Sequence, residues 1–297
     1  MNPDISIGAT KHIDLIKSNL NRQVQGMENN GMKLEVDELP LGKYTFLNFN
    51  VKKANSGYQN YQLFKNSVAS VISDVILNKW ENYIIYDIIR ENYYYYNEDE
   101  RNKIFKYAQE HVNNNEGITE LDYKPVHQDR RAQIYQQLKE YLSNNDHLVV
   151  DGFIQFRLKD YVSFLREVTE SAVDEFLMER EYDEFIQILR YFAEIQEPKV
   201  NEVHVVLKPD STYKLYDENK DVINSDYLEE FIMTMNEEIN YEDLVISALI
   251  SISPKEIVFH HDKEKIPNNT IKTIKDVFID KVNVCNGCQW CETEMKS

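Results

Sequence analysis

Apolar residues recur at helical spacing through the middle of the chain. Between Tyr61 and Tyr93 an apolar residue returns every four positions, at Ile72, Ile76, Trp80, Ile84 and Ile88. Positions three and four apart lie on one face of an α-helix, so this pattern predicts a long, deeply buried helix. Similar spacing predicts further helices over residues 98–112, 129–142, 154–180 and 182–195, the last of which ends before Pro198.

The N-terminal part of the chain is less regular. Ile5, Ile13, Ile16 and Leu20 lie near helical spacing and predict a helix that ends near Val24. The segments 33–36 and 44–51 are rich in β-branched and aromatic residues, so they are predicted to form a pair of β-strands.

Beyond Pro198 the period changes from about 3.5 to 2, as expected for strands. Alternating residues from Val203 to Leu207, followed by 213–217, predict a β-hairpin in which His204 lies on the exposed side. Helices are expected over 225–235 and 241–250. A strand (256–260), a helix (269–278) and a strand (281–285) then have the length of a βαβ unit, so these two strands should be parallel.

These elements predict an α+β fold with a predominantly helical middle. We divide the chain into a small N-terminal α/β segment (1–58), a helical region (59–198) and a C-terminal α/β domain with a βαβ unit (199–297). A chain of 297 residues is long enough for such a division.

The charge balance restricts the partners. Lys and Arg number 33 against 51 Asp and Glu, so the formal net charge is −18. Such an acidic protein would be repelled by nucleic-acid backbones and anionic bilayers, so we expect neither nucleic-acid binding nor membrane insertion. The segment 68–89 is apolar but is interrupted by four charged residues, and the N-terminus has no secretory pattern. A cytoplasmic location is expected.

One group of residues could carry chemistry. Cys285, Cys288 and Cys291 have the spacing C-x-x-C-x-x-C, in which thiolates can converge on one ion. His260 and His261 end the first strand of the predicted βαβ unit, and Cys285 ends the second. If the strands are adjacent, an imidazole completes a zinc site, or the thiolates hold an iron–sulfur cluster. The alternatives are a redox-labile tail, a thiol pair with a spare cysteine, and small apolar side chains.

Other features of the sequence favour structural roles. Asp151, Arg157, Lys159 and Asp160 place four charges around one helix start, a pattern typical of solvated capping and ion-pair surfaces. The phosphate-binding, dinucleotide-binding, serine-hydrolase and zincin motifs are all missing from the sequence. No enzyme class is therefore indicated.

Several blocks of the chain resemble one family. The segments DGFIQFRLKDY, AVDEFLMEREYDEFIQILRYF, EIQEPKVNEVHVVL, YKLYDE and VCNGCQWC, between Leu148 and Cys291, resemble the sporulation protein YtxC family of endospore-forming bacteria. The resemblance implies a cytoplasmic protein associated with spore formation, with no established reaction, substrate or cofactor. The C-x-G-C-x-x-C pattern of the family matches Cys285, Gly287, Cys288 and Cys291.

Two hypotheses for the function follow. In the first, favoured by the resemblance, the chain is a sporulation-associated interaction or regulatory protein without catalysis, whose acidic surface binds another protein. In the second, the chain is a metal-binding or redox protein that uses Cys285, Cys288, Cys291 and His260 to hold zinc or an iron–sulfur cluster.

Overall fold

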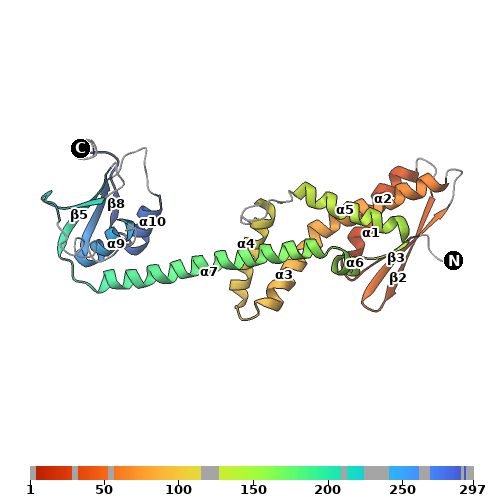
Figure 1. Cartoon of the computed structure of the whole chain (residues 1–297), viewed down its shortest axis with the longest axis horizontal. Helices are drawn as coiled ribbons and strands as arrows, with labels where there is room; N and C mark the ends of the chain where they lie inside the picture. The colour runs from red at the N-terminus through yellow and green to blue at the C-terminus, as the bar shows by residue number, and fades with distance from the viewer. Residues whose placement is uncertain are drawn as a thin grey trace. The chain divides into compact units, whose positions relative to one another are not determined.

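The computed structural model describes residues 5–28, 33–52, 57–114, 127–208, 213–223, 241–260, 268–288 and 291. The chain divides into two compact units, Met1–Leu177 and Met178–Ser297. The boundary falls inside one long helix, α7 (Lys159–Ile195), which contributes to both units (Figure 1). The division at residues 58 and 198, made from the sequence, remains a prediction.

The first unit contains a four-stranded sheet with the order β2-β3-β1-β4. Its strands are β1 (Ile5–Ala9), β2 (Lys33–Leu41), β3 (Tyr44–Lys52) and β4 (His147–Val149). The predicted pair of strands, β2 and β3, is confirmed and is antiparallel, whereas β1 and β4 are parallel.

The predicted helix beginning at Ile5 is wrong in its first turn. Residues Ile5–Ala9 form the strand β1, and helix α1 begins only at Ile13. All five residues of β1 are buried, and the alternation Ile5-Ser6-Ile7 is too short to distinguish a strand from the start of a helix. A side chain at Gly8 would clash, since an added Cβ would lie 2.5 Å from the ring of Phe46.

The helices of this unit follow the predicted apolar spacing closely. They are α1 (Ile13–Glu28), α2 (Gly57–Val75), α3 (Glu81–Asn92), α4 (Glu98–Asn114), α5 (His127–Asn144) and α6 (Val150–Arg157). A π-helical turn, η1 (Ile76–Trp80), joins α2 to α3 without a break, so the helix predicted between Tyr61 and Tyr93 is confirmed. One core lies between the sheet and α1, α2, α5 and α6, and another among α3, α4 and α7.

A buried lysine joins two elements of the first core. The Lys65 side chain is 6% exposed, and its Nζ lies 2.8 Å from Asp146 Oδ1 and 2.5 Å from the Leu142 carbonyl oxygen. The Tyr61 hydroxyl donates a second hydrogen bond to Asp146, at 2.7 Å. This network ties α2 to the end of α5.

Helix α7 is longer than the sequence pattern predicts. The two helices expected over 154–180 and 182–195 are one continuous helix, and the interruption falls earlier, between α6 and α7 at Leu158. The sequence between Arg180 and Tyr182 contains neither Pro nor Gly, so nothing there ends the helix.

The second unit contains the other four-stranded sheet, with the order β6-β5-β7-β8. Its strands are β5 (Val200–Leu207), β6 (Tyr213–Asp217), β7 (Pro254–His260) and β8 (Val282–Val284), and its helices are α9 (Tyr241–Ile252) and α10 (Asn268–Val277). The predicted hairpin and the predicted parallel βαβ unit are confirmed. The predicted helix over 225–235 lies outside the described residues.

The helices of the second unit pack on one face of its sheet. Val203, Val205, Ile257 and Phe259 face a core that includes residues of α7, α9 and α10. Side chains alternate along a strand, so His204 and His260 belong to the opposite face.

The architecture confirms the α+β fold class. No helix among the described residues has the length and apolar character that crossing a membrane requires.

Candidate metal centre

The parallel strands β7 and β8 bring the candidate ligands to one edge of the sheet. Phe259 pairs with Val284, so His260 and Cys285 are the next residues along two neighbouring strands. The backbone N–H of Cys285 donates to the Phe259 carbonyl at 2.9 Å, which holds the start of the cysteine segment against β7. Parallel strands place their carboxyl ends together, as the sequence analysis assumed.

Four ligand atoms converge at this edge. The Nδ1 atom of His260 and the sulfurs of Cys285, Cys288 and Cys291 all lie within 4.8 Å of one another. The Cys291 sulfur lies 3.3 Å from His260 Nδ1, 3.6 Å from the Cys288 sulfur and 3.7 Å from the Cys285 sulfur. The Cys288 sulfur lies 3.7 Å from His260 Nδ1. This group could hold a metal ion.

These distances match the edges of a small tetrahedron. With Zn–S bonds of about 2.3 Å and Zn–N bonds of about 2.0 Å, tetrahedral geometry separates two sulfurs by about 3.8 Å and a sulfur from a nitrogen by about 3.5 Å. Four of the six pairs of ligand atoms lie 3.3 to 3.7 Å apart, and all six lie within 4.8 Å. The donor set therefore fits a single tetrahedral ion.

The turn between the first two cysteines requires a glycine. Gly287 has φ = 111°, a conformation that side chains bearing a Cβ rarely adopt. This conformation reverses the chain after Cys285 and lets Cys288 return toward His260.

A second histidine lies behind His260. His204 Nδ1 is 3.0 Å from His260 Nε2, and His204 Nε2 is 3.3 Å from a carboxylate oxygen of Glu202. His260 is buried, so its ring is fixed between these groups and the thiols. If Nδ1 of His260 offers its lone pair to an ion, Nε2–H donates to His204, and His204 Nε2–H donates to Glu202.

Burial also changes the proton affinity of the site. Burial, together with hydrogen bonds of the Cys291 thiol to the sulfurs of Cys288 and Cys285, raises the pKa of the Cys291 thiol to about 11. Burial lowers the pKa of His204, which favours the neutral imidazole, the form that can both accept from His260 and donate to Glu202.

The sequence analysis named three cysteines and His260, and the structure brings these four together. His261, the other histidine named with them, lies outside the described residues. His204 lies on the face of the sheet opposite the helices, as predicted, but only 14% of its side chain is exposed, so the expectation that it faces solvent is wrong. Its position two residues after Glu202 was visible in the sequence, but the strand register that places it beside His260 was not.

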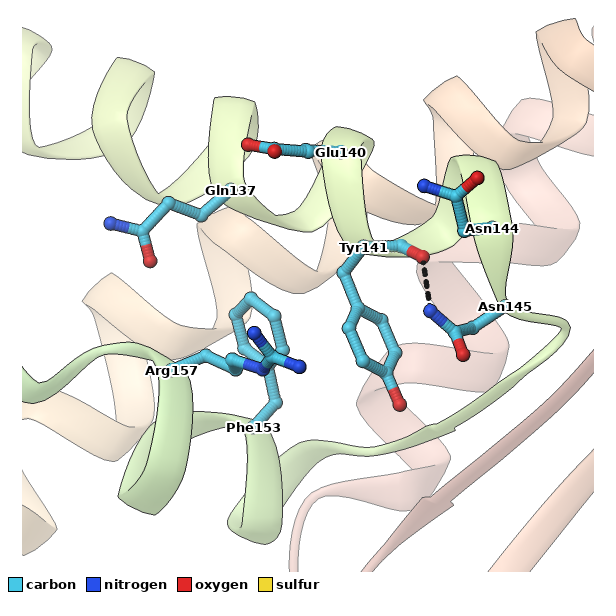
Figure 2. Close-up of a pocket in the computed structure, with 7 residues that line it drawn as sticks. All are labelled: Gln137, Glu140, Tyr141, Asn144, Asn145, Phe153 and Arg157. Atoms are coloured by element: carbon cyan, nitrogen blue, oxygen red, sulfur yellow. Dashed lines mark hydrogen bonds between the residues drawn. The ribbon is translucent and has the colours of Figure 1, made fainter.

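The charges around Asp151 and Arg157 do not converge. The Asp151 carboxylate accepts hydrogen bonds from the Thr10 backbone N–H at 2.9 Å and from the Thr10 hydroxyl at 2.5 Å, so Asp151 has a structural contact. Arg157 lines a pocket of about 430 Å³ on another side. Figure 2 shows its guanidinium near Tyr141 and Phe153, with Asn145 hydrogen bonded to the Tyr141 carbonyl. No arrangement of catalytic groups is evident in this pocket.

The comparisons with known proteins agree with the resemblance noted in the sequence. An uncharacterized protein, YtxC of Bacillus subtilis (strain 168), is 25% identical over 241 residues, which covers 79% of this chain and 80% of that protein. No solved structure matches the chain. The profile of the YtxC-like family matches residues 66–283, which include His204 and His260 and end just before Cys285. Because that match covers more than half of its length, this chain belongs to the YtxC-like family.

Proposed function

We propose that this protein binds one zinc ion at the carboxyl edge of its C-terminal sheet through Cys285, Cys288, Cys291 and His260. The observation that carries the proposal is the convergence of three sulfurs and one imidazole nitrogen within 4.8 Å. Zinc prefers such nitrogen and sulfur ligands in tetrahedral geometry.

The spacing favours a single ion over an iron–sulfur cluster. In a [4Fe–4S] cluster each cysteine binds a different iron atom, so the cluster keeps the cysteine sulfurs further apart than the ligands of one ion. The sulfurs of Cys288 and Cys285 each lie within 3.7 Å of that of Cys291, a spacing that fits the ligands of one ion. A [2Fe–2S] cluster would need two ligands on each of two irons, whereas the four ligand atoms here lie around one point.

The proposed role of the ion is structural rather than catalytic. Four protein ligands close a tetrahedral zinc site, whereas catalytic zinc sites keep a position for water or substrate. The ion would join the C-terminal segment to β7 and β8, which otherwise pair over only three residues of each strand.

Cobalt(II) substitution tests this proposal without an assay for activity. The metal-free protein, titrated with Co²⁺ without oxygen, should give the visible absorption of a tetrahedral ion and the charge-transfer bands of three thiolates, and Zn²⁺ should displace it. Cys288→Ser and His260→Ala should weaken these bands, whereas replacement of His147, an exposed histidine of the first unit, by Ala should not. Octahedral Co²⁺ spectra in the unaltered protein would contradict the proposal.

We also propose, as a second function, a non-enzymatic role for this protein in spore formation, as an interaction or regulatory protein of the cytoplasm. Membership of the YtxC-like family and the net charge of −18 support this role. Deletion of the gene in its spore-forming host should lower the number of heat-resistant spores, and the unaltered gene should restore it. Spore counts unchanged by the deletion would contradict this second proposal.

A further inference from the structure

The part of α7 that belongs to the second unit has two apolar faces. One face packs on the core of that unit through Tyr182, Ile186, Leu189 and Ala193. A second face carries Phe185, Ile188, Phe192 and Ile195, which are 53%, 55%, 46% and 57% exposed. Single exposed apolar residues are ordinary on a protein surface, but four large ones on one helix face are not.

The exposed face has the spacing of a coiled-coil seam. Its residues follow one another by three, four and three positions, so they form a stripe along nearly three helical turns. Such a stripe is complementary to the apolar face of another helix, which can insert its side chains between these four. We call these four residues the α7 stripe.

The charges beside the α7 stripe select the kind of helix. Glu181 and Glu184 are exposed beside it, each one helical turn before a stripe residue. Asp183 and Glu194 are exposed on another side of the same segment and add to its negative charge. The basic residues there are already engaged, because Arg180 pairs with Glu184 at 3.7 Å and Arg190 donates to the Asp276 carbonyl at 2.7 Å. A partner helix should therefore carry Lys or Arg beside its apolar face.

The same charges disfavour a second copy of this chain. Two α7 stripes packed together would bring the carboxylates of one copy close to those of the other, and like charges across an interface oppose association. An anionic membrane surface is disfavoured for the same reason.

We propose that the α7 stripe is the docking surface for a basic amphipathic helix of a partner protein. This inference names the surface that the proposed interaction function would use, so it rests on that second proposed function and not on the metal centre. Its test needs neither spores nor metal, so its failure is distinguishable from a failure of either proposal.

Three synthetic helical peptides of about three heptads serve as probes. The first has Leu at the seam positions and Lys beside them, the second has Glu in place of Lys, and the third has the composition of the first in scrambled order. Fluorescence anisotropy measures their binding to the full chain, to the double variant Ile188→Ser/Phe192→Ser, and to Phe156→Ser. Phe156 is a matched control because it is also exposed, at 65%, on helix α6.

We expect the basic probe to bind the unaltered chain and the Phe156→Ser variant equally. It should bind the double variant at least about tenfold more weakly, since two large apolar contacts are lost. The acidic probe should bind the unaltered chain at least about tenfold more weakly than the basic one. The stripe residues are exposed, so the double variant should keep the circular dichroism of the unaltered chain.

Three outcomes would overturn the proposal. The scrambled probe could bind as well as the basic one, which would reduce the effect to charge attraction alone. The double variant could bind the basic probe normally. Sedimentation equilibrium could show that the unaltered chain forms a dimer and the double variant a monomer, which would assign the stripe to a second copy.

Discussion

His204 contacts His260 rather than the thiols, so its role in the proposed centre is positioning. With His260 Nδ1 bound to the ion, His204 Nδ1 would accept a hydrogen bond from His260 Nε2–H, which keeps the lone pair of His260 Nδ1 directed at the ion. Glu202 orients His204 in the same way from behind. Groups behind the ligands of a metal ion commonly affect affinity almost as strongly as the ligands do.

The first prediction concerns His204. Replacing it by Ala should weaken zinc binding about 10- to 100-fold, because the ring of His260 loses the acceptor that fixes its orientation. His204→Asn, whose side-chain oxygen can take the position of Nδ1, should recover part of the affinity. Competition with a chromogenic chelator measures both variants, with His147→Ala as the control. Equal affinity in His204→Ala and in the unaltered chain would remove the positioning role.

The second prediction concerns Asp146. Hydrogen bonds from Lys65 and Tyr61 lower the pKa of this carboxyl group in the folded protein. The stability that the carboxylate contributes is therefore present above its ordinary pKa of about 4 and is lost as the pH falls through the lower folded value.

Urea unfolding of the unaltered chain and of Asp146→Asn measures this effect. The difference between their free energies of unfolding should be constant near pH 6 and should shrink below about pH 4, as Asp146 becomes protonated. A difference that stays the same down to about pH 2 would show that the contact with Lys65 does not depend on the charge of Asp146.

At this scale the sequence predicted the ligands better than their surroundings. The cysteine spacing and the strand that ends at His260 were enough to anticipate the group of four. His204 was missed because a histidine between two buried valines in a strand is expected to face solvent. His204 pairs with Val258 on the neighbouring strand, and His260 lies two residues beyond Val258. This strand register makes the two histidines neighbours, and the sequence does not reveal it.

At the scale of elements, α7 shows how burial distinguishes residues that the sequence treats alike. Ile186 and Ile188 are the same residue two positions apart, yet Ile186 is 5% exposed and belongs to the core, whereas Ile188 belongs to the α7 stripe. Ile186→Ala should lower the free energy of unfolding by about 2–5 kcal/mol. Ile188→Ala should change it by less than about 0.5 kcal/mol. Chemical denaturation compares the two, and equal losses would mean that both faces of α7 are buried.

The elements that the sequence predicted correctly have strong periodicity or clear boundaries. The helix from α2 to α3 keeps its apolar spacing even through the π-helical turn, and the βαβ unit is set by its length. The strand β1 was missed because five residues with a single apolar–polar alternation do not separate a strand from the first turn of a helix. The sequence pattern predicted two helices where α7 is a single one. The apolar residues of α7 lie on two faces, and this arrangement resembles the pattern of two separate helices.

At the scale of the whole molecule, the proposed ion belongs to one of two compact units with separate cores. Binding of zinc should therefore stabilise the second unit and leave the first unchanged. Hydrogen exchange measured with zinc and with a chelator should show faster exchange without the ion at the amides of β7 and β8, and equal exchange at those of β1 and β3. A uniform change over both units would contradict a local structural role.

The central claim is that three cysteines and one histidine hold one zinc ion. Elemental analysis of protein purified without oxygen tests it most directly, in the unaltered chain and in the Cys285→Ser/Cys288→Ser/Cys291→Ser variant. We predict one zinc per unaltered chain, none in the variant, and no visible absorption from iron and sulfide. Folded, unaltered protein that contains no metal and takes up none when zinc is added would contradict the claim.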